Sequence, residues 1–108
     1  MSPADLVQTQ LDAYNAQDVE RFCAVYAENC VLASYNGDVL AEGVAAIRAR
    51  HVNLFAAHPQ NKAKLKNRIA FANTVIDHVE RAPGGERFEV AAIYTIEDGR
   101  IARVEFAR

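Results

Sequence analysis

The last third of the chain, residues 74–108, alternates apolar and polar residues with the period of two that is typical of β-strands. Turn-forming residues interrupt the alternation at residues 82–85 (APGG) and again at Asp98-Gly99, a dipeptide that tolerates the positive φ angles of a tight hairpin. β-branched and aromatic residues flank both turns. The pattern therefore predicts three consecutive antiparallel strands, which the rest of the chain covers.

One acid interrupts the apolar face of these strands. If the first turn takes four residues, Asp77 lies opposite Val90 on a face that is otherwise apolar. The apolar residues of that face are Val75, Val79, Phe88, Val90, Ala92, Tyr94 and Ile96. The polar pairs of the opposite face are Glu80 with Arg87 and His78 with Glu89. Because an isolated carboxylate is costly to bury, Asp77 either pairs with Arg68 or caps a backbone group to hold the fold, or it lines a pocket.

The first part of the chain has the signals of two amphipathic helices. Ser2 is a helix N-cap followed by proline at the first helical position, and Asp5 favours the positive end of the helix dipole. The pattern breaks at residues 15–17, after which Asp18 can cap a second helix. Apolar residues at helical spacing continue that helix to about residues 28–29.

The middle of the chain predicts a hairpin, a third helix and a further strand. Residues 30–35 and 38–42 form the hairpin around Asn36-Gly37, a type I′ turn signal. Helical periodicity then runs over residues 44–58 and stops at Pro59. Residues 65–71 favour a strand that turns at residues 72–73 into the final three strands.

This order, α-α-β-β-α-β-β-β-β, predicts a single α+β domain over residues 1–108. Three helices pack on a strongly curved antiparallel sheet, and the curvature leaves a conical hollow at the open end. The two cysteines, Cys23 and Cys30, lack metal-binding or redox spacing and are interpreted as small buried hydrophobic residues.

Charge and hydropathy exclude several classes of partner. The formal net charge is −2 and the pI is about 5.9, without a basic stripe, so we expect no nucleic-acid partner. No stretch approaches the roughly 20 apolar residues of a membrane span, and the N-terminal residues lack the charged start and apolar block of a signal peptide. We therefore expect a cytoplasmic protein that does not bind membranes.

Four local motifs occur in the same order as in a known superfamily. They are NAQD at residues 15–18, YAENCVL at residues 26–32, the G-x-x-A-I-R pattern at residues 43–48 and YTIEDGRIARVEF at residues 94–106. Over nearly its whole length the chain resembles SnoaL-like, nuclear-transport-factor-2-like domains, which include ketosteroid isomerases, polyketide cyclases and limonene epoxide hydrolases. The run at residues 67–80 is similar to a branch of small proteins whose chemistry is not settled. The resemblance implies a cone-shaped fold with a central pocket and chemistry without a cofactor.

The catalytic residues of ketosteroid isomerases are not carried over. Alignment through the shared motifs places Gln10, Ser34 and Ala92 where those enzymes have a tyrosine, an aspartate base and an aspartic acid. Serine and alanine supply no general base, although Gln10 can donate a hydrogen bond.

The candidate catalytic residues are Asp77, Arg68, His51 and Tyr94. A two-residue turn at residues 72–73 places Arg68 directly opposite Asp77, but it also turns the apolar residues of that strand outward, so we expect a bulge there. His51 is either a proton-transfer group or a histidine at the core edge, and Tyr94 shares the face of Asp77. No metal site is expected, because about 10.5 Å of helix separates His51 from His58.

The candidate ligand-binding residues are those expected around the hollow: Tyr14, Gln10, Phe22, Tyr26, Ser34, Phe55, Val75, Val90, Ala92 and Phe106. Three hypotheses follow. The chain is a cofactor-free isomerase, cyclase or hydrolase acting on a small, largely apolar molecule, or it is a non-catalytic ligand-binding or scaffold module. In the third hypothesis large side chains fill the hollow, namely Phe22, Phe55, Phe71 and Phe106.

The outer face of the predicted sheet is too apolar for a monomer. The residues expected there are Ala70, Thr74, Ile76, Ala91, Ile93 and Ile101. Relatives of this fold commonly pair through that face, so we expect an isologous homodimer.

Overall fold

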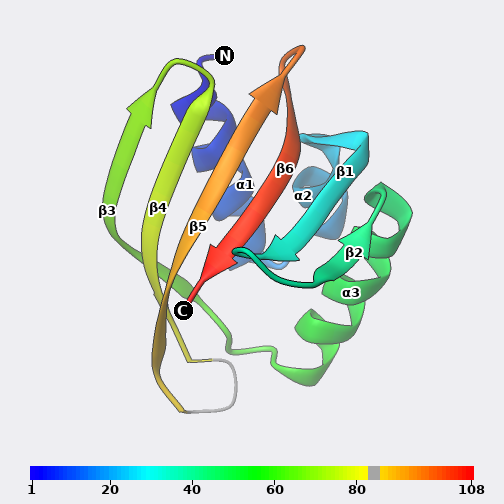
Figure 1. The fold of residues 1–108 in the computed structure, drawn as a ribbon. Helices are drawn as coiled ribbons and strands as arrows, with labels where there is room; N and C mark the ends of the chain where they lie inside the picture. Colours follow the sequence, from blue (N-terminus) through cyan, green and yellow to red (C-terminus); the bar gives the residue numbers. More distant parts are fainter. Residues whose placement is uncertain (83–85) are drawn as a thin grey trace.

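The computed structural model describes residues 1–82 and 86–108, which form three helices and a six-stranded sheet (Figure 1). The elements are α1 (Pro3–Ala16), α2 (Val19–Ala24), β1 (Tyr26–Ser34), β2 (Val39–Glu42), α3 (Val44–Ala57), β3 (Ala63–Phe71), β4 (Thr74–Arg81), β5 (Phe88–Glu97) and β6 (Arg100–Ala107). The predicted class and order of elements are confirmed. Among the described helices, none is long and apolar enough to cross a membrane.

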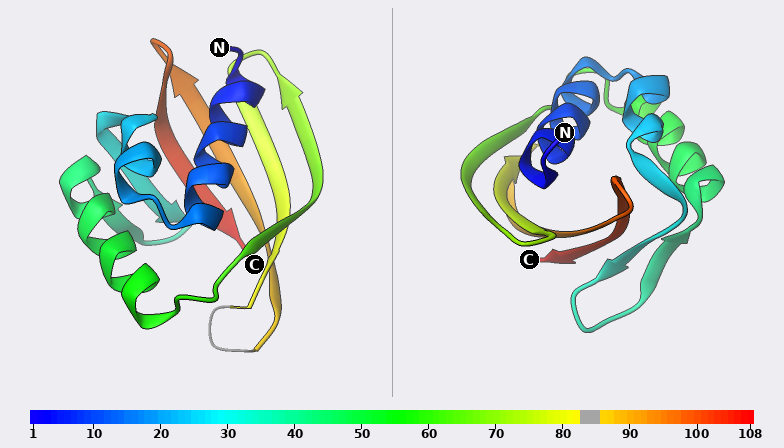
Figure 2. Two further views of the ribbon diagram at one scale, coloured as in Figure 1. Left: turned by 180° about the vertical axis from the view of Figure 1, so that it is seen from behind. Right: turned by 90° about the horizontal axis from the view of Figure 1, so that it is seen from above.

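The strands lie in the order β2-β1-β6-β5-β4-β3. Every pair is antiparallel except β1 with β6, which is parallel, so the sheet is mixed and not purely antiparallel. The difference arises because β3 to β6 form a meander that starts at the far edge, and its last strand reaches β1 pointing in the same direction. Viewed from above, the sheet curls around the helices (Figure 2).

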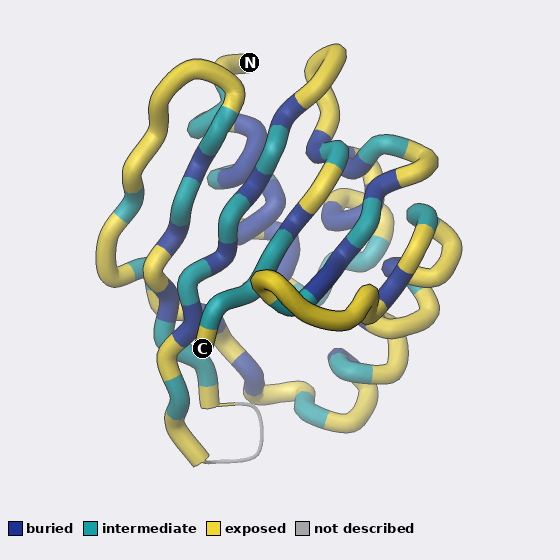
Figure 3. Tube along the Cα trace, in the orientation of Figure 1, coloured by how far each residue is buried: buried dark blue, intermediate teal, exposed yellow. Residues whose placement is uncertain are grey.

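The concave face of the sheet and the three helices enclose the core. α1 packs against β3, β4 and β6, whereas α3 packs against β1 and β2. Buried positions alternate with more exposed ones along β4 and β5 (Figure 3). The most deeply buried large apolar side chains are Val7, Phe22, Leu32, Ile47, Val75, Ile101 and Val104. Both cysteines are free and buried, as expected.

The register of β4 with β5 differs from the prediction by two residues. Asp77 lies opposite Ala92 and Arg81 opposite Phe88, so the connection runs over residues 82–87. The predicted turn at residues 82–85 falls partly outside the described residues. Because side chains alternate with a period of two, a slip of two keeps each residue on its predicted face, and Asp77 is only 1% exposed.

The predicted helix starts are confirmed. Ser2 and Asp5 form a reciprocal capping box at α1, and the side chain of Asp18 accepts a hydrogen bond from the backbone of Arg21 at α2. The predicted end of the second helix near residues 28–29 is wrong, since α2 ends at Ala24. Strand pairing overrides the helical spacing there, because the Ile101 N–H donates to the Val25 carbonyl oxygen and β1 begins at Tyr26.

Two local deviations affect how the strands present their side chains. The first hairpin turn is wider than type I′: Asn36 has a φ of 54°, but Gly37 does not have a positive φ, and the Ser34 N–H donates to the Asp38 carbonyl oxygen. The expected bulge in β3 is confirmed as a register shift between Leu65 and Asn67.

Ile101 lies opposite the inward-facing Ile96, next to the Asp98-Gly99 turn, and a second register shift, between Thr95 and Ile96, lets Val104 face the core as well. Ile101 has no exposed surface, so its predicted place on the outer face is wrong. Ile76 and Ile93 lie opposite each other and are half-buried, in the same row as Ile69. That row forms the middle of an apolar strip on the outer face.

Candidate functional site

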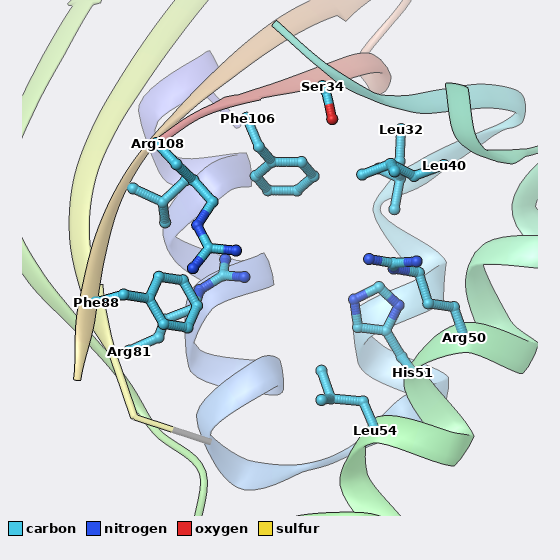
Figure 4. Close-up of a pocket in the computed structure, with 11 residues that line it drawn as sticks. Leu32, Ser34, Leu40, Arg50, His51, Leu54, Arg81, Phe88, Phe106 and Arg108 are labelled. Carbon is cyan, nitrogen blue, oxygen red and sulfur yellow. The ribbon is translucent and has the colours of Figure 1, made fainter. Parts of the chain in front are cut away.

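A cavity of about 290 Å³ opens between α3, the β1–β2 hairpin and the ends of β4, β5 and β6 (Figure 4). Its walls are mostly apolar, and their polar members are three arginines, one histidine and one serine. The lining residues are Leu32, Ser34, Leu40, Arg50, His51, Leu54, Arg81, Phe88, Val90, Phe106 and Arg108. No carboxylate is among them. The cavity is therefore cationic, although the whole chain carries a net charge of −2.

His51 projects from α3 into this cavity (Figure 4). Its ring packs beside Phe22, with the centroids 4.3 Å apart, and its Nδ1 lies 2.8 Å from the carbonyl oxygen of Ile47 one turn earlier. Because a carbonyl oxygen only accepts, Nδ1 carries the proton of the neutral ring and Nε2 keeps a lone pair. In Figure 4 the ring nitrogen farther from the helix faces the cavity.

The surroundings keep this ring neutral. Burial lowers the pKa of His51 to about 4; the hydrogen bond to the Ile47 carbonyl opposes that shift, and the charges of Arg50 and Arg81 add to it. A neutral imidazole with an accepting nitrogen in an open cavity has the form of a general base. Of the four predicted catalytic residues, His51 is the one that lines the cavity.

Two arginines on the sheet side are held by aromatic rings. The guanidinium carbon of Arg81, at the end of β4, lies 4.9 Å from the centre of the Tyr14 ring and 5.6 Å from that of Phe106. The guanidinium carbon of Arg108 lies 4.1 Å from the centre of the Phe88 ring. Arg50 lines the cavity from α3 on the opposite side (Figure 4). Contact with the ring faces fixes the planes of the Arg81 and Arg108 guanidinium groups.

These cavity arginines lack acidic partners. Arg48, Arg68, Arg87 and Arg103 each lie within 4.0 Å of a carboxylate, but within the described chain no such pair involves Arg50, Arg81 or Arg108. The Nε of Arg81 is buried and has no hydrogen-bond partner among the residues described. Buried donors normally have acceptors, so the described protein leaves the hydrogen-bonding capacity of this guanidinium partly unmatched.

Asp77 and Arg68 are sealed against each other away from the cavity. Arg68 Nε donates to Asp77 Oδ1 at 2.7 Å and Arg68 Nη2 donates to Asp77 Oδ2 at 2.8 Å, a bidentate pair in the predicted register. Arg68 Nη1 also donates to Gln8 Oε1 of α1 at 2.8 Å. Both carboxylate oxygens are engaged, and the network ties α1 to β3 and β4.

Tyr94 also lies inside the core and not on the cavity wall. Its hydroxyl donates to Gln10 Oε1 at 3.1 Å, and burial raises the pKa of that hydroxyl above its ordinary value. Because the Tyr94 hydroxyl keeps its proton and already donates it to the Gln10 amide oxygen, it does not act as a donor to a ligand in the cavity. Its contact with Gln10 joins α1 to the middle of the sheet.

The predicted ligand-binding residues divide into two groups. Ser34, Val90 and Phe106 line the cavity. The others are buried in the core next to it, and they are Tyr14, Gln10, Phe22, Tyr26, Phe55, Val75 and Ala92. Aromatic rings therefore fill the deep part of the cone while its mouth stays open. Phe71, which the third hypothesis placed in the hollow, is 61% exposed.

Sequence reasoning missed the three arginines of the cavity. Arg81 follows Val75, Asp77 and Val79 at a spacing of two, so its inward direction was readable from the strand pattern. Arg108 follows Val104 and Phe106 at the same spacing, and Arg50 lies three residues after Ile47 in the predicted helix. Over the described positions, no three His, Cys, Asp or Glu side chains group closely enough to hold a metal ion.

Comparison with solved structures identifies similar chains. A protein from Novosphingobium aromaticivorans, described as an uncharacterized cystatin-fold protein, is 33% identical with a TM-score of 0.96, covering 100% of this chain and 99% of that one. A proposed polyketide cyclase from Sinorhizobium meliloti is 24% identical with a TM-score of 0.82, and the match covers 94% of this chain and 93% of that one. A proposed ketosteroid isomerase from Kribbella flavida is 19% identical with a TM-score of 0.84, and the match covers 97% of this chain and 76% of that one.

The sequence identities of the last two proteins to this chain are low, so these matches show a shared fold alone. No curated protein matches the sequence. The sequence pattern that defines the SnoaL-like domain matches residues 7–104, nearly the whole chain. With this match over most of its length, the chain belongs to the SnoaL-like domain family.

Proposed function

We propose that this protein is a cofactor-free enzyme of the isomerase or cyclase type and that its active site is the cavity beside His51. The observation that carries the proposal is the neutral imidazole of His51, whose Nδ1 is held by the Ile47 carbonyl while its ring faces the cavity. Apolar walls fit a small, largely apolar substrate.

In the proposed step, Nε2 of His51 takes a proton from the carbon next to a substrate carbonyl, and the electron pair of that C–H bond moves toward the carbonyl oxygen. The oxygen becomes an enolate, and the cavity arginines stabilise its charge. His51 is a weak base because its pKa is about 4, so it depends on this stabilisation to make the carbon acidic. Where a double bond is conjugated with the enolate, return of the proton from His51 to the far carbon of the conjugated system shifts the double bond and gives an isomer. Attack of the enolate carbon on a second carbonyl instead closes a ring, and the new alkoxide oxygen takes the proton from His51.

Asp77, Arg68 and Tyr94 act as positioning residues in this proposal. The bidentate Arg68–Asp77 pair joins β3 to β4, and the Arg68–Gln8 and Tyr94–Gln10 hydrogen bonds hold α1 against the sheet. Tyr14 of the same helix then places its ring under the guanidinium of Arg81. The pair thus supports the cavity without contacting the substrate.

Deuterium exchange tests this base directly. 2-Tetralone, a bicyclic ketone with acidic protons beside its carbonyl, is incubated with the protein in D₂O, and loss of its proton signal is followed by NMR. We expect exchange above background in the native protein and a loss of about a hundredfold or more in His51→Gln, the range that a general base supplies. The matched control is His78→Gln, because His78 lies on the outer face paired with Glu89.

Exchange that persists undiminished in His51→Gln contradicts the assignment of the base. A non-catalytic ligand-binding module is the second candidate, and one observation favours it. Apart from His51 and the arginines, the cavity-lining residues include no Asp, Glu, Lys, Cys or Tyr, so they supply no separate acid. Binding of 2-tetralone to the native protein without any exchange is the result expected of that module.

A further inference from the structure

The charge of the cavity determines which substrates it can hold. Arg50, Arg81 and Arg108 lie around one cavity of about 290 Å³ without a carboxylate among the lining residues. Like charges in a partly enclosed, low-dielectric space repel one another. Arg48, Arg87 and Arg103 on the surface lie within 4.0 Å of a carboxylate, whereas among the described residues none of the three cavity arginines does. An anionic ligand would supply the missing counter-charge.

The orientation of the arginines favours a planar anion. The guanidinium of Arg81 lies over the rings of Tyr14 and Phe106, and its buried Nε has no acceptor in the described protein. The two Nη groups at the outer end of a guanidinium match the two oxygens of a carboxylate. A bidentate contact of a guanidinium with a carboxylate already occurs in the same sheet, where Arg68 binds Asp77 through Nε and Nη2.

The remaining walls fit an apolar body of limited size. Leu32, Leu40 and Leu54 lie on the side of β1, β2 and α3, opposite Phe88 and Phe106 on the sheet (Figure 4). The volume is near the lower end of the range for small-molecule sites, about 300 to 1,000 Å³. One or two rings fit such a space, whereas a larger, multi-ring molecule does not.

We infer that the substrate of this site is a small carboxylate with an apolar body of one or two rings, whose carboxylate is bound by the guanidinium of Arg81 and whose body lies between the leucines and the phenylalanines. Arg50 and Arg108 add to the attraction from either side. This inference rests on the proposed function, since it names the substrate class of the same site. It also explains why a protein with a net negative charge gathers unpaired arginines at one cavity.

Calorimetric titration with 2-naphthoate and its neutral isostere 2-naphthamide tests the inference at low salt. We expect 2-naphthoate to bind at least tenfold more tightly than 2-naphthamide, and added salt to reduce that advantage. Arg81→Met keeps the apolar stem and removes the charge, so the affinity for 2-naphthoate should fall about tenfold while that for 2-naphthamide changes less than threefold. Arg103→Met, on the outer face, is the matched control and should change neither affinity.

A second readout separates a specific site from general attraction between charges. The bound carboxylate offsets the charges of Arg50 and Arg81 that face His51 from α3 and β4, so the pKa of His51 measured by NMR should rise from about 4 when 2-naphthoate saturates the protein. Acetate and inorganic phosphate, which lack the apolar body, should bind at least tenfold more weakly than 2-naphthoate. If Arg81→Met does not fold, Arg50→Met, at an exposed position on α3, should still weaken 2-naphthoate binding several-fold.

Equal affinities for 2-naphthoate and 2-naphthamide would overturn the inference, as would equal losses in Arg81→Met and Arg103→Met. Binding of phosphate as tight as that of 2-naphthoate would also overturn it, because the site would then recognise charge alone. 2-Naphthoate has no proton that the proposed reaction can remove, so its binding is independent of turnover. Failure to detect exchange with 2-tetralone therefore contradicts the proposed function and leaves this inference standing.

Discussion

His51 and Asp77 are both buried titratable residues, but their neighbours give them different chemical capacities. Asp77 has both oxygens engaged by Arg68, so it has no lone pair directed at a cavity. His51 has one nitrogen fixed by the Ile47 carbonyl and an imidazole edge on the cavity. Accessibility of the reactive atom, and not burial alone, therefore favours the histidine as the functional group.

The pKa of His51 makes a prediction about stability against pH. The folded state lowers that pKa from 6.5 to about 4, so between these pH values the unfolded chain binds a proton that the folded chain does not. Stability is therefore highest above pH 6.5 and decreases as the pH falls toward 4. At ~1.4 kcal/mol per pKa unit the full effect is about 3 kcal/mol. We expect the free energy of unfolding, measured with urea, to fall less in His51→Gln than in the native protein as the pH is lowered from 7.5 to 4.5. Parallel curves of this free energy against pH would contradict the prediction.

Residue-level prediction from the sequence succeeded where alternation decides direction. The inward face of β4, with Asp77, and the position of Arg68 opposite Asp77 both follow from a period of two and a two-residue turn. Whether Asp77 faces a cavity depends on how the aromatic side chains of α1 and α2 fill the cone, and periodicity along one strand contains no information about that packing.

At the level of elements, register shifts decide what each strand presents. The slip of two between β4 and β5 left both faces as predicted, whereas the one-residue shift between β5 and β6 lets Ile101 and Val104, three residues apart on one strand, both face the core. An even slip preserves the faces and an odd one exchanges them. The sequence contains no turn residue at the second shift, so that bulge was not predictable from the pattern.

The Arg68–Asp77 pair joins β3 to β4, and Arg68 also donates a hydrogen bond to Gln8 of α1. Arg68→Met leaves the Asp77 carboxylate buried without a partner, and we expect a loss of about 3 kcal/mol in the free energy of unfolding. The matched control is Arg87→Met: Arg87 is 75% exposed at its side chain and lies 3.8 Å from Glu80, so the loss should stay below about 1 kcal/mol. If urea unfolding gave equal losses of unfolding free energy in Arg68→Met and Arg87→Met, the buried pair would have no special structural role.

At the level of the whole molecule, the order of elements and the cone fold followed from turn signals, helix caps and the resemblance to SnoaL-like domains. The parallel pairing of β1 with β6 did not, because it depends on the arrangement of the whole sheet. The cationic character of the cavity also appears only in three dimensions, since its arginines come from α3, the end of β4 and residue 108.

We propose that the outer face of the sheet pairs two copies of the chain. Ile69, Ile76 and Ile93 form a row across three strands, next to Phe71 and Ala91, and Ile69 is 51% exposed. We expect native protein to sediment as a dimer at micromolar concentration and Ile69→Glu to shift it toward the 11.9 kDa monomer. Val52→Glu, at an exposed position on α3, should leave the dimer intact. A native protein that sediments only as a monomer rules out the pairing.

The central claim is that the open cavity beside His51, and not the interior around Asp77, is the functional site. The most direct test is an NMR titration with 2-tetralone that follows the backbone amide signals of the ¹⁵N-labelled protein. We predict that the largest shifts cluster on cavity-lining residues such as Leu32, His51 and Phe106. Shifts centred instead on Gln10, Asp77 and Tyr94 would contradict the claim.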